Sequence, residues 1–437
     1  MNMPQSESDV VITGIGLVTP IGIGVDPVWS SLQNGVCGFR PTEVVGFIGS
    51  PDSVGGEVSD FDDSSAKKVH LKDLRKQIKV MCREIQLGVA SALQAVAHSG
   101  LDMGAVSGER IGVGFGANLM SSPPGVLTDA CLAAADPSTG HFDYSRWGLD
   151  GEARFRGMEP LWLLKYLPNM PGCHIGIALD ARGPNNSLTQ EEVCGALCLS
   201  EAAGIIRRGR ADVMITGTTG TRLHAVKACH HMKWDTLADG PADSRCRPLD
   251  RNRRGEVVAE NACTLILESR AHAEARGAKI WGTVLATAAS CVVGADGQGN
   301  EQAALEAAAA TALKKAGVTP GDLGHVNMSA SGSPERDAYE AAAVCSVLGD
   351  SATAVPVTAL KSYMGSSGSG SAVAEIAASL LGLDNGVVLK TLNFEATDSD
   401  TPLNVVRDEH LKTDNRLFLK TSVTRMGQAA AVVVGPA

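Results

Sequence analysis

The chain has 437 residues, a formal net charge of −10 and a hydrophobic content of 44%. This negative charge argues against a nucleic-acid partner, which needs a basic face. The sequence contains no stretch of about 18 apolar residues without a charge, so no membrane span is predicted. The length exceeds that of one simple core, so two domains or two related halves are expected.

The cysteine pattern indicates neither cross-links nor a metal site. Eleven cysteines are spaced irregularly, without a Cys-x-x-Cys pair. We therefore expect reduced thiols, a cytoplasmic location, no metal and no other cofactor. Residues 1–14 lack a basic stretch followed by an apolar core and do not resemble a signal peptide. Two short basic runs, 207–208 and 251–254, predict solvated turns or, alternatively, a docking patch for an acidic carrier protein.

Strands and helices alternate along the first half of the chain. The β-branched run 9–22 closes with Pro and Gly and predicts a buried strand and a loop. Residues 80–100 have helical periodicity and end at a glycine. The further predicted elements are strands over 110–119, 211–219 and 261–269 and a helix over 192–208.

The same alternation begins again in the second half. Such a series predicts parallel or mixed sheets with helices on their faces. Two series predict an α/β fold built from two related halves, residues 1–268 and residues 269–437. The elements expected here are helices over 301–318, 337–349 and 371–383, and strands over 324–333, 354–362, 415–424 and 429–435.

Five segments together carry a resemblance to a known family. They are VVITGIGLVTPIG (10–22), the stretch from GPNNSLTQEEVC onward (183–217), CRPLDRNRRGEVVAENA (246–262), VNMSASGSPERDAYEA (326–341) and ALKSYMGSSGSGSAVAE (359–375). In order and spacing the chain resembles a β-ketoacyl-[acyl carrier protein] synthase of the thiolase superfamily over nearly its whole length. The resemblance implies a five-layered αβαβα thiolase-type fold and a dimer. It also implies a loop, here residues 116–126, that approaches the partner's cavity.

Family members use a cysteine at a helix N-terminus, two histidines and a lysine to join acyl units carried on acyl carrier protein. A helix N-terminus favours the thiolate and the oxyanion. In this chain Glu192 stands at the cysteine position, and Ser329 and Ser366 stand at the two histidine positions. Lys361 and Glu340 match the family's lysine and helix carboxylate. The resemblance therefore implies that ordinary condensing activity is absent from this chain alone.

The C-terminal loop TRMGQAA departs from the family pattern as well. Arg425 replaces the aromatic residue that gates the acyl pocket, whereas Gly427 is retained. We take Arg425, Gly427 and Ser331 as candidate substrate-binding residues. Ser329 and Ser366 lack a visible activating base, so a hydrolase is a weak interpretation.

Glu192 has three possible roles. It can be a structural charge at a helix N-terminus, which contributes about 0.3–1 kcal/mol. It can act as acid, base or nucleophile on an acyl thioester, or it can recognise a ligand. Glu191 is interpreted as a neighbour or a dimer contact. Cys194 and Cys198 are expected to be buried structural residues, since a two-residue helical step turns Cys194 by about 200° from Glu192.

Three functions remain open. The first is a catalytically degenerate homologue in fatty acid or polyketide biosynthesis. It would act as a chain-length-factor-like partner of a cysteine-containing ketosynthase and bind acyl chains or acyl carrier protein. The second is an enzyme with altered acyl-thioester chemistry that uses Glu192. The third is a homodimeric protein that binds an acyl ligand. His230 and His231 show no carboxylate partner in the sequence and are expected to be structural.

Overall fold

The computed structural model describes residues 9–43, 54–149 and 158–437. The expectation about a signal peptide concerns residues 1–14, of which residues 1–8 lie outside this range. Within the described ranges, no helix is long and apolar enough to cross a membrane.

The twelve-stranded sheet consists of two groups of strands joined by a short seam. At the seam β1 (Val10–Thr19) pairs with β9 (Gly282–Cys291) through Val11–Thr283 and Ile12–Gly282. The first group continues from β1 through β8 (Glu260–Ser269), β7 (Val213–Thr221) and β5 (Ile111–Ala117) to β6 (Asn185–Leu188), and the two-residue strand β2 (Gly22–Ile23) pairs with β1 beside this path. The second group continues from β9 through β16 (Gln428–Gly435), β15 (Phe418–Val423), β10 (His325–Met328) and β11 (Pro356–Ala359) to β13 (Asn404–Val405).

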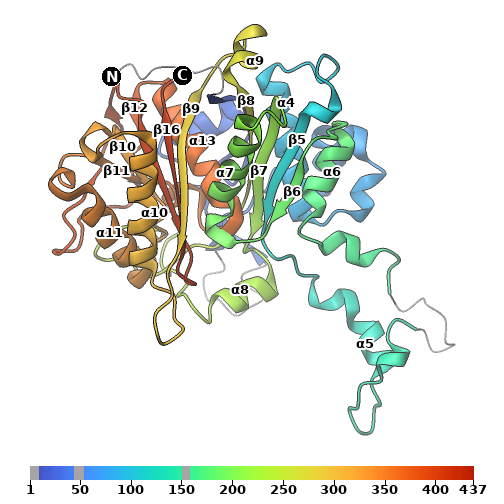
Figure 1. Ribbon diagram of the computed structural model, residues 1–437. Coiled ribbons are helices and arrows are strands. Elements are labelled where there is room, and N and C mark those ends of the chain that lie inside the picture. Colours follow the sequence, from blue (N-terminus) through green and yellow to red (C-terminus); the bar gives the residue numbers. More distant parts are fainter. Residues whose placement is uncertain (1–8, 44–53, 150–157) are drawn as a thin grey trace.

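Helices cover both outer faces and fill the space between the two groups (Figure 1). On one outer face, α4 (Arg83–Ser99) packs against β1, β7 and β8. In the middle, α7 (Cys194–Arg207) contacts β7 and β9, and α13 (Ser371–Asp384) contacts β8, β10 and α7. On the other outer face, α10 (Glu301–Ala316) contacts β9, β16 and α11 (Pro334–Leu348). The order is the αβαβα layering that the sequence predicts.

The composition of the helices explains their layers. Every residue of α13 from Ser371 to Leu383 is buried. An apolar, small-residue surface on all sides suits a helix between two layers of strands, whereas an outer helix buries one stripe. In α4 the predicted glycine stop is confirmed: Gly100 has φ 63° and caps the helix in the left-handed conformation.

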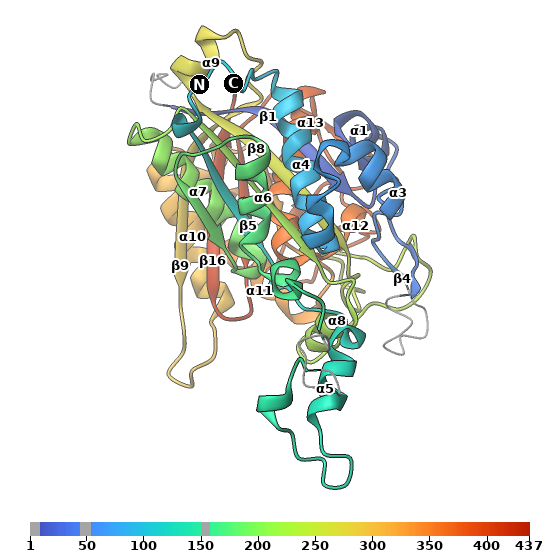
Figure 2. The ribbon, with the colours of Figure 1, turned by 90° about the vertical axis from the view of Figure 1, so that its right-hand side faces the viewer.

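An arm projects from the layered body after β5. It carries the short helix α5 (Thr128–Ala134) and lies below the body in both Figure 1 and Figure 2. Its large apolar side chains are unusually accessible: Leu132 is 69% exposed and Tyr144 is 80% exposed. Residues 116–126, the predicted partner-facing loop, lead from β5 into this arm.

Candidate functional site

Glu192 lies where the chain turns from β6 into the middle layer. A short 3-10 turn, Glu191–Val193, precedes α7. Glu191 has φ 46°, a left-handed conformation that is uncommon outside glycine. This turn leaves the Glu191 side chain about half exposed, whereas only 5% of Glu192 is accessible. The position predicted for a nucleophile therefore holds a buried carboxylate.

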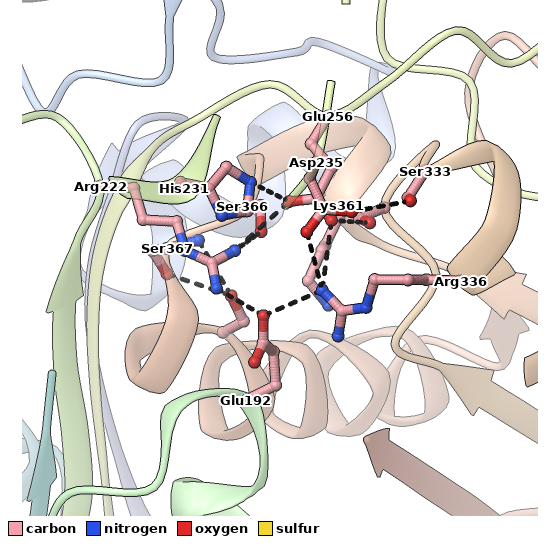
Figure 3. A network of polar contacts seen from close by, with 12 residues as sticks. Glu192, Arg222, His231, Asp235, Glu256, Ser333, Arg336, Lys361, Ser366 and Ser367 are labelled. Carbon is pink, nitrogen blue, oxygen red and sulfur yellow. Dashed lines mark hydrogen bonds and ion pairs between the residues drawn. The ribbon is translucent and has the colours of Figure 1, made fainter. Parts of the chain in front are cut away.

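Two arginines bind the Glu192 carboxylate (Figure 3). Nη2 of Arg222 lies 2.5 Å from Oε1 of Glu192, and Nη1 of Arg336 lies 3.4 Å from the same oxygen. Arg222 directly follows β7, and Arg336 belongs to the first turns of α11. Both arginine side chains are buried, so their charges need paired carboxylates.

Glu256 is the second carboxylate of this cluster and is fully buried. It lies 3.3 Å from Arg222, 3.5 Å from Arg336 and 3.1 Å from Nε2 of His231. His231 thus has a carboxylate partner that is not visible in the sequence, because tertiary folding brings a distant glutamate to the ring. His230, by contrast, is exposed.

Asp235 and Glu301 extend the cluster toward the surface. Asp235 lies 3.7 Å from Arg336 and 3.0 Å from Arg425, and Glu301 lies 3.3 Å from Arg336. The ion-pair cluster, as we call it from here, comprises Glu192, Arg222, His231, Asp235, Glu256, Glu301, Arg336 and Arg425.

The local field holds the innermost carboxylates in their charged form. Burial alone would raise the pKa of Glu192, but the charges of Arg222 and Arg336 outweigh it and the pKa falls to about 2. The pKa of Glu256 also lies well below its usual range, because His231, Arg222 and Arg336 overcome its desolvation. At neutral pH, Glu192 is thus a poor proton acceptor, since a useful general base has a pKa near the working pH.

The two serines at the histidine positions enter different contacts. Ser366 accepts a hydrogen bond from Nη1 of Arg222 and so belongs to the surroundings of Glu192. Ser329 is held elsewhere: Nζ of Lys361 donates to its carbonyl oxygen at 2.5 Å and to its hydroxyl at 3.0 Å. The backbone N–H of Ser329 donates to Glu340 at 2.8 Å.

Lys361 and Glu340 thus hold the loop after β10. Lys361 also pairs with the buried Glu375 at 2.9 Å, and Lys420 pairs with the other oxygen of Glu375. Burial raises the pKa of Glu340 despite the nearby Lys420. Lys361 and Glu340 therefore both have hydrogen-bond partners within the fold.

The candidate substrate-binding residues also have internal partners. Ser331 donates its hydroxyl to Glu256 at 2.5 Å. Arg425 donates to the carbonyl oxygen of Trp234, and its side chain is 32% exposed. Gly427 has φ 71°, and a Cβ there would meet the carbonyl oxygen of Val292 and lie 2.8 Å from the backbone nitrogen of Asn300. A close approach of two backbones therefore accounts for this glycine.

The cysteines next to Glu192 face the sheet. All eleven cysteines are free thiols. Sγ of Cys194 donates to the carbonyl oxygen of Leu188 at 3.2 Å, and both Cys194 and Cys198 are buried. A Cβ placed on Gly116 of β5 would lie 3.2 Å from Sγ of Cys198 and closer still to Sγ of Cys194. This location agrees with the expected structural role.

Three residues of the ion-pair cluster have side chains of the kinds that bind metal ions. His231, Asp235 and Glu256 offer ligand atoms within 4.8 Å of one another. Both carboxylates already pair with guanidinium groups, Asp235 with Arg336 and Arg425, and Glu256 with Arg222 and Arg336. Ion pairing therefore accounts for their proximity.

Most of the cluster was not predicted from the sequence. The residues without a prediction are Arg222, Asp235, Glu256, Glu301 and Arg336, which are brought together only by the fold. A usable signal existed for Arg222, which directly follows a strand of apolar and small residues and must be paired if buried. The expected solvated turn over 251–254 is wrong for Arg253, whose side chain is 7% exposed and pairs with Asp398 at 2.8 Å. Arg254 is exposed as predicted.

The same arrangement of segments occurs in proteins of known family. The family model described as the N-terminal domain of β-ketoacyl synthases matches residues 7–273, and that of the C-terminal domain matches residues 282–395. The chain belongs to the β-ketoacyl synthase family. The predicted resemblance is thereby confirmed, while the boundary at residue 268 stays a prediction.

Two curated relatives illustrate the range of this β-ketoacyl synthase family. The ketoacyl synthase alpha subunit of tetracenomycin polyketide synthase from Streptomyces glaucescens is 32% identical, over 94% of this chain and 93% of the relative. The 3-oxoacyl-[acyl-carrier-protein] synthase 2 of Synechocystis is 28% identical, over 91% of this chain and 90% of the relative. Relatives of this chain thus act in polyketide synthesis and on acyl carrier protein.

Solved structures agree with the thiolase-type fold. The structure titled the ishigamide ketosynthase/chain length factor superposes with a TM-score of 0.84 at 25% identity, covering 98% of this chain and 99% of the other. A β-ketoacyl synthase from Burkholderia phymatum gives the same TM-score at 21% identity, with the same coverage. The predicted αβαβα fold is confirmed.

Proposed function

We propose that this chain is a non-condensing subunit of a polyketide or fatty acid synthase. In this role it pairs, in the manner of a chain-length factor, with a ketosynthase that has the cysteine and both histidines. The substrate of the assembly is an acyl chain on acyl carrier protein. The observation that carries the proposal is the buried Glu192 carboxylate, clamped by Arg222 and Arg336 at the position of the nucleophile.

The relatives support a two-chain assembly. The ishigamide structure is named for both a ketosynthase and a chain length factor, and this chain matches it at 25% identity over 98% of its length. Another matched structure is titled as an acyl-carrier protein in complex with its ketosynthase. The cytoplasmic location stays a prediction of the same proposal.

The surface of the chain supports a partner as well. β6 is the last strand of the sheet, so one of its edges is unpaired within the described residues. The arm nearby exposes Leu119, Leu132, Tyr144 and Leu161, each by more than 60%. Large apolar side chains exposed along one projecting segment are typical of an interaction surface. A second chain that covers the arm and β6 would bury the exposed apolar side chains and cover the unpaired strand edge.

The two other interpretations receive less support. Catalysis by Glu192 as acid or base is disfavoured by a pKa of about 2 and by the two buried arginine partners. A homodimeric acyl-binding protein needs an open cavity at the site, where Glu192 and Glu256 each contact the side chain of Arg336.

Co-purification from native cells tests the proposal. The tagged full-length chain is isolated and its stoichiometric partners are identified by mass spectrometry. We expect a ketosynthase with an intact cysteine and two histidines, and condensation of acyl units by the pair but by neither chain alone. Glu192→Gln should leave the activity of the pair within about twofold, because the carboxylate takes no part in the chemistry. Condensation by the isolated chain would overturn the proposal.

Two matched surface variants examine the arm. Leu132→Lys places a charge on the arm, at a side chain that is 69% exposed. Val69→Lys makes the same change at a side chain that is 62% exposed and belongs to the helical turn Ala66–His70. We expect Leu132→Lys to weaken partner binding at least tenfold and Val69→Lys to leave it unchanged. Equal effects of the two changes would exclude the arm from the interface.

A further inference from the structure

The guanidinium groups around Glu192 are held in place by contacts that do not involve Glu192. Arg222 pairs with Glu256 at 3.3 Å and donates to Ser366. Arg336 pairs with Glu256 at 3.5 Å and donates to the carbonyl oxygen of Val423 at 2.9 Å. Both groups would therefore keep their orientation toward this point if the Glu192 carboxylate were removed.

Figure 3 shows the Glu192 carboxylate between the two guanidinium groups, with Arg222 on one side and Arg336 on the other. The three residues come from separate elements: the turn before α7, the residue after β7 and α11. A carboxylate fixed by converging, buried arginines has the geometry of a ligand in an anion site. Here the ligand is part of the chain.

We propose that Arg222 and Arg336 form a preformed receptor for a small carboxylate and that Glu192 is its built-in occupant. This inference concerns the same site and rests on the proposed function for its biological role. The occupant fills the place of the nucleophile and keeps external carboxylates out. A chain without the Glu192 side chain should bind short carboxylic acids such as formate or acetate, whose single charged group matches the receptor.

The local field agrees with this assignment. Burial and the repulsion from Glu256 both act against the charged form of Glu192, yet its pKa lies well below the usual range because of the two arginines. Removal of the side chain would take from Nη2 of Arg222 its nearest acceptor, at 2.5 Å, and leave Glu191 at 3.5 Å; the loss of a close acceptor is costly for a buried charged donor. An external carboxylate can supply that acceptor.

Chemical rescue of Glu192→Ala tests the receptor. The thermal midpoints of the full-length wild type and the variant are measured in sodium formate and in sodium chloride of equal ionic strength. Formate has three non-hydrogen atoms, so its affinity is limited to the millimolar range and about 50 mM is a suitable concentration. We expect the variant to lose several degrees in chloride and to regain at least half of that loss in formate. The wild type should not respond to formate.

Two control variants separate rescue from a general salt effect. Glu192→Gln keeps the volume of the side chain, fills the receptor with a neutral amide and should show no formate response. Glu191→Ala removes a half-exposed carboxylate that lies 3.5 Å from Nη2 of Arg222 but leaves Glu192 in the receptor, so it should show none either. A formate response shared by Glu191→Ala, or absent from Glu192→Ala, would overturn the proposal.

Direct binding gives a second readout. Isothermal titration of folded Glu192→Ala with formate should show one millimolar site, which the wild type and Glu192→Gln lack. Failure of Glu192→Ala to fold even when formate is present throughout expression and purification would also overturn the receptor. These results do not depend on the partner: a wild type that binds no ketosynthase removes the proposed function and leaves the receptor intact.

Discussion

Nη1 of Arg336 lies 3.5 Å from Oε1 of Glu256, and both side chains are buried. The two residues belong to different segments, α11 and the stretch that leads into β8. Arg336 also pairs with Glu192 and Glu301, so one guanidinium neutralises carboxylates from several parts of the fold. The cluster stabilises the fold only while its charges remain paired.

Arg336→Met should therefore destabilise the chain strongly. The change leaves several buried carboxylates with too few cations, which costs about 3–5 kcal/mol when one partner of a buried pair is removed. Urea denaturation measures the free energy of unfolding. Arg254→Met is the matched control, because that arginine is exposed and lies 3.9 Å from an exposed Asp239. The control should stay within about 0.5 kcal/mol of the wild type, and a similar loss in both would contradict the role of Arg336.

The stability contributed by Glu192 should depend on pH. Its pKa falls from an ordinary value of 4.5 to about 2 in the folded chain. A carboxyl whose pKa is lowered on folding stabilises the protein above its unfolded pKa, and this contribution is lost as the pH falls from 4.5 toward 2. A difference of this size corresponds to about 3 kcal/mol.

The comparison of wild type with Glu192→Gln isolates this contribution. The free energy of unfolding of each is measured at about pH 7, 5 and 3 by urea denaturation. We expect the advantage of the wild type to be constant from pH 7 to pH 5 and to shrink by pH 3. An advantage that is unchanged at pH 3 would show that the folded carboxylate is not held in its charged form.

Gly116→Ala should perturb the contact between β5 and α7. The new Cβ would lie 2.9 Å from Cγ2 of Thr218 and 3.2 Å from Sγ of Cys198, and closer still to Cys194. Overpacking of this kind costs about 1–3 kcal/mol. Gly125→Ala, whose new Cβ would meet no atom within 4 Å, is the control. Equal melting midpoints for the two variants would contradict the packing described at Gly116.

The thiols should differ in reactivity according to burial. Cys229 and Cys291 are exposed, whereas Cys194 and Cys198 are buried. Maleimide labelling of the native chain, followed by peptide mass spectrometry, should modify the first two within minutes. The second two should react only after unfolding, because a buried structural thiol is inaccessible. Acylation of Cys194 by a thioester probe in the native chain would instead make it a substitute nucleophile.

Local patterns were sufficient to predict most of the fold. The run 10–19 forms β1, in which every residue is buried, and residues 83–99 form α4 with the predicted cap at Gly100. A continuous β-branched, apolar run and a glycine after a helical repeat are both clear local signals. The turn before α7 was less predictable. The predicted helix over 192–208 begins instead with a 3-10 turn, since the left-handed Glu191 redirects the chain at its start.

The candidate site could be predicted only in part. Position in the family pattern was enough to select Glu192, Ser366 and Arg425, and the structure brings them into the surroundings of one ion-pair cluster. Lys361 and Ser329 bond to each other instead. The same pattern could not select Arg222 or Glu256, because their role arises from contacts across long stretches of chain.

The sequence by itself determined the family, the layered α/β fold and the replacement of the nucleophile by Glu192. These properties depend on residue order, spacing and hydrophobic periodicity, all of which can be read along the chain. Only the tertiary structure decided how the Glu192 charge is compensated. A buried carboxylate must find cations in three dimensions, and Arg222 and Arg336 reach it from elements that lie 30 and 144 residues away.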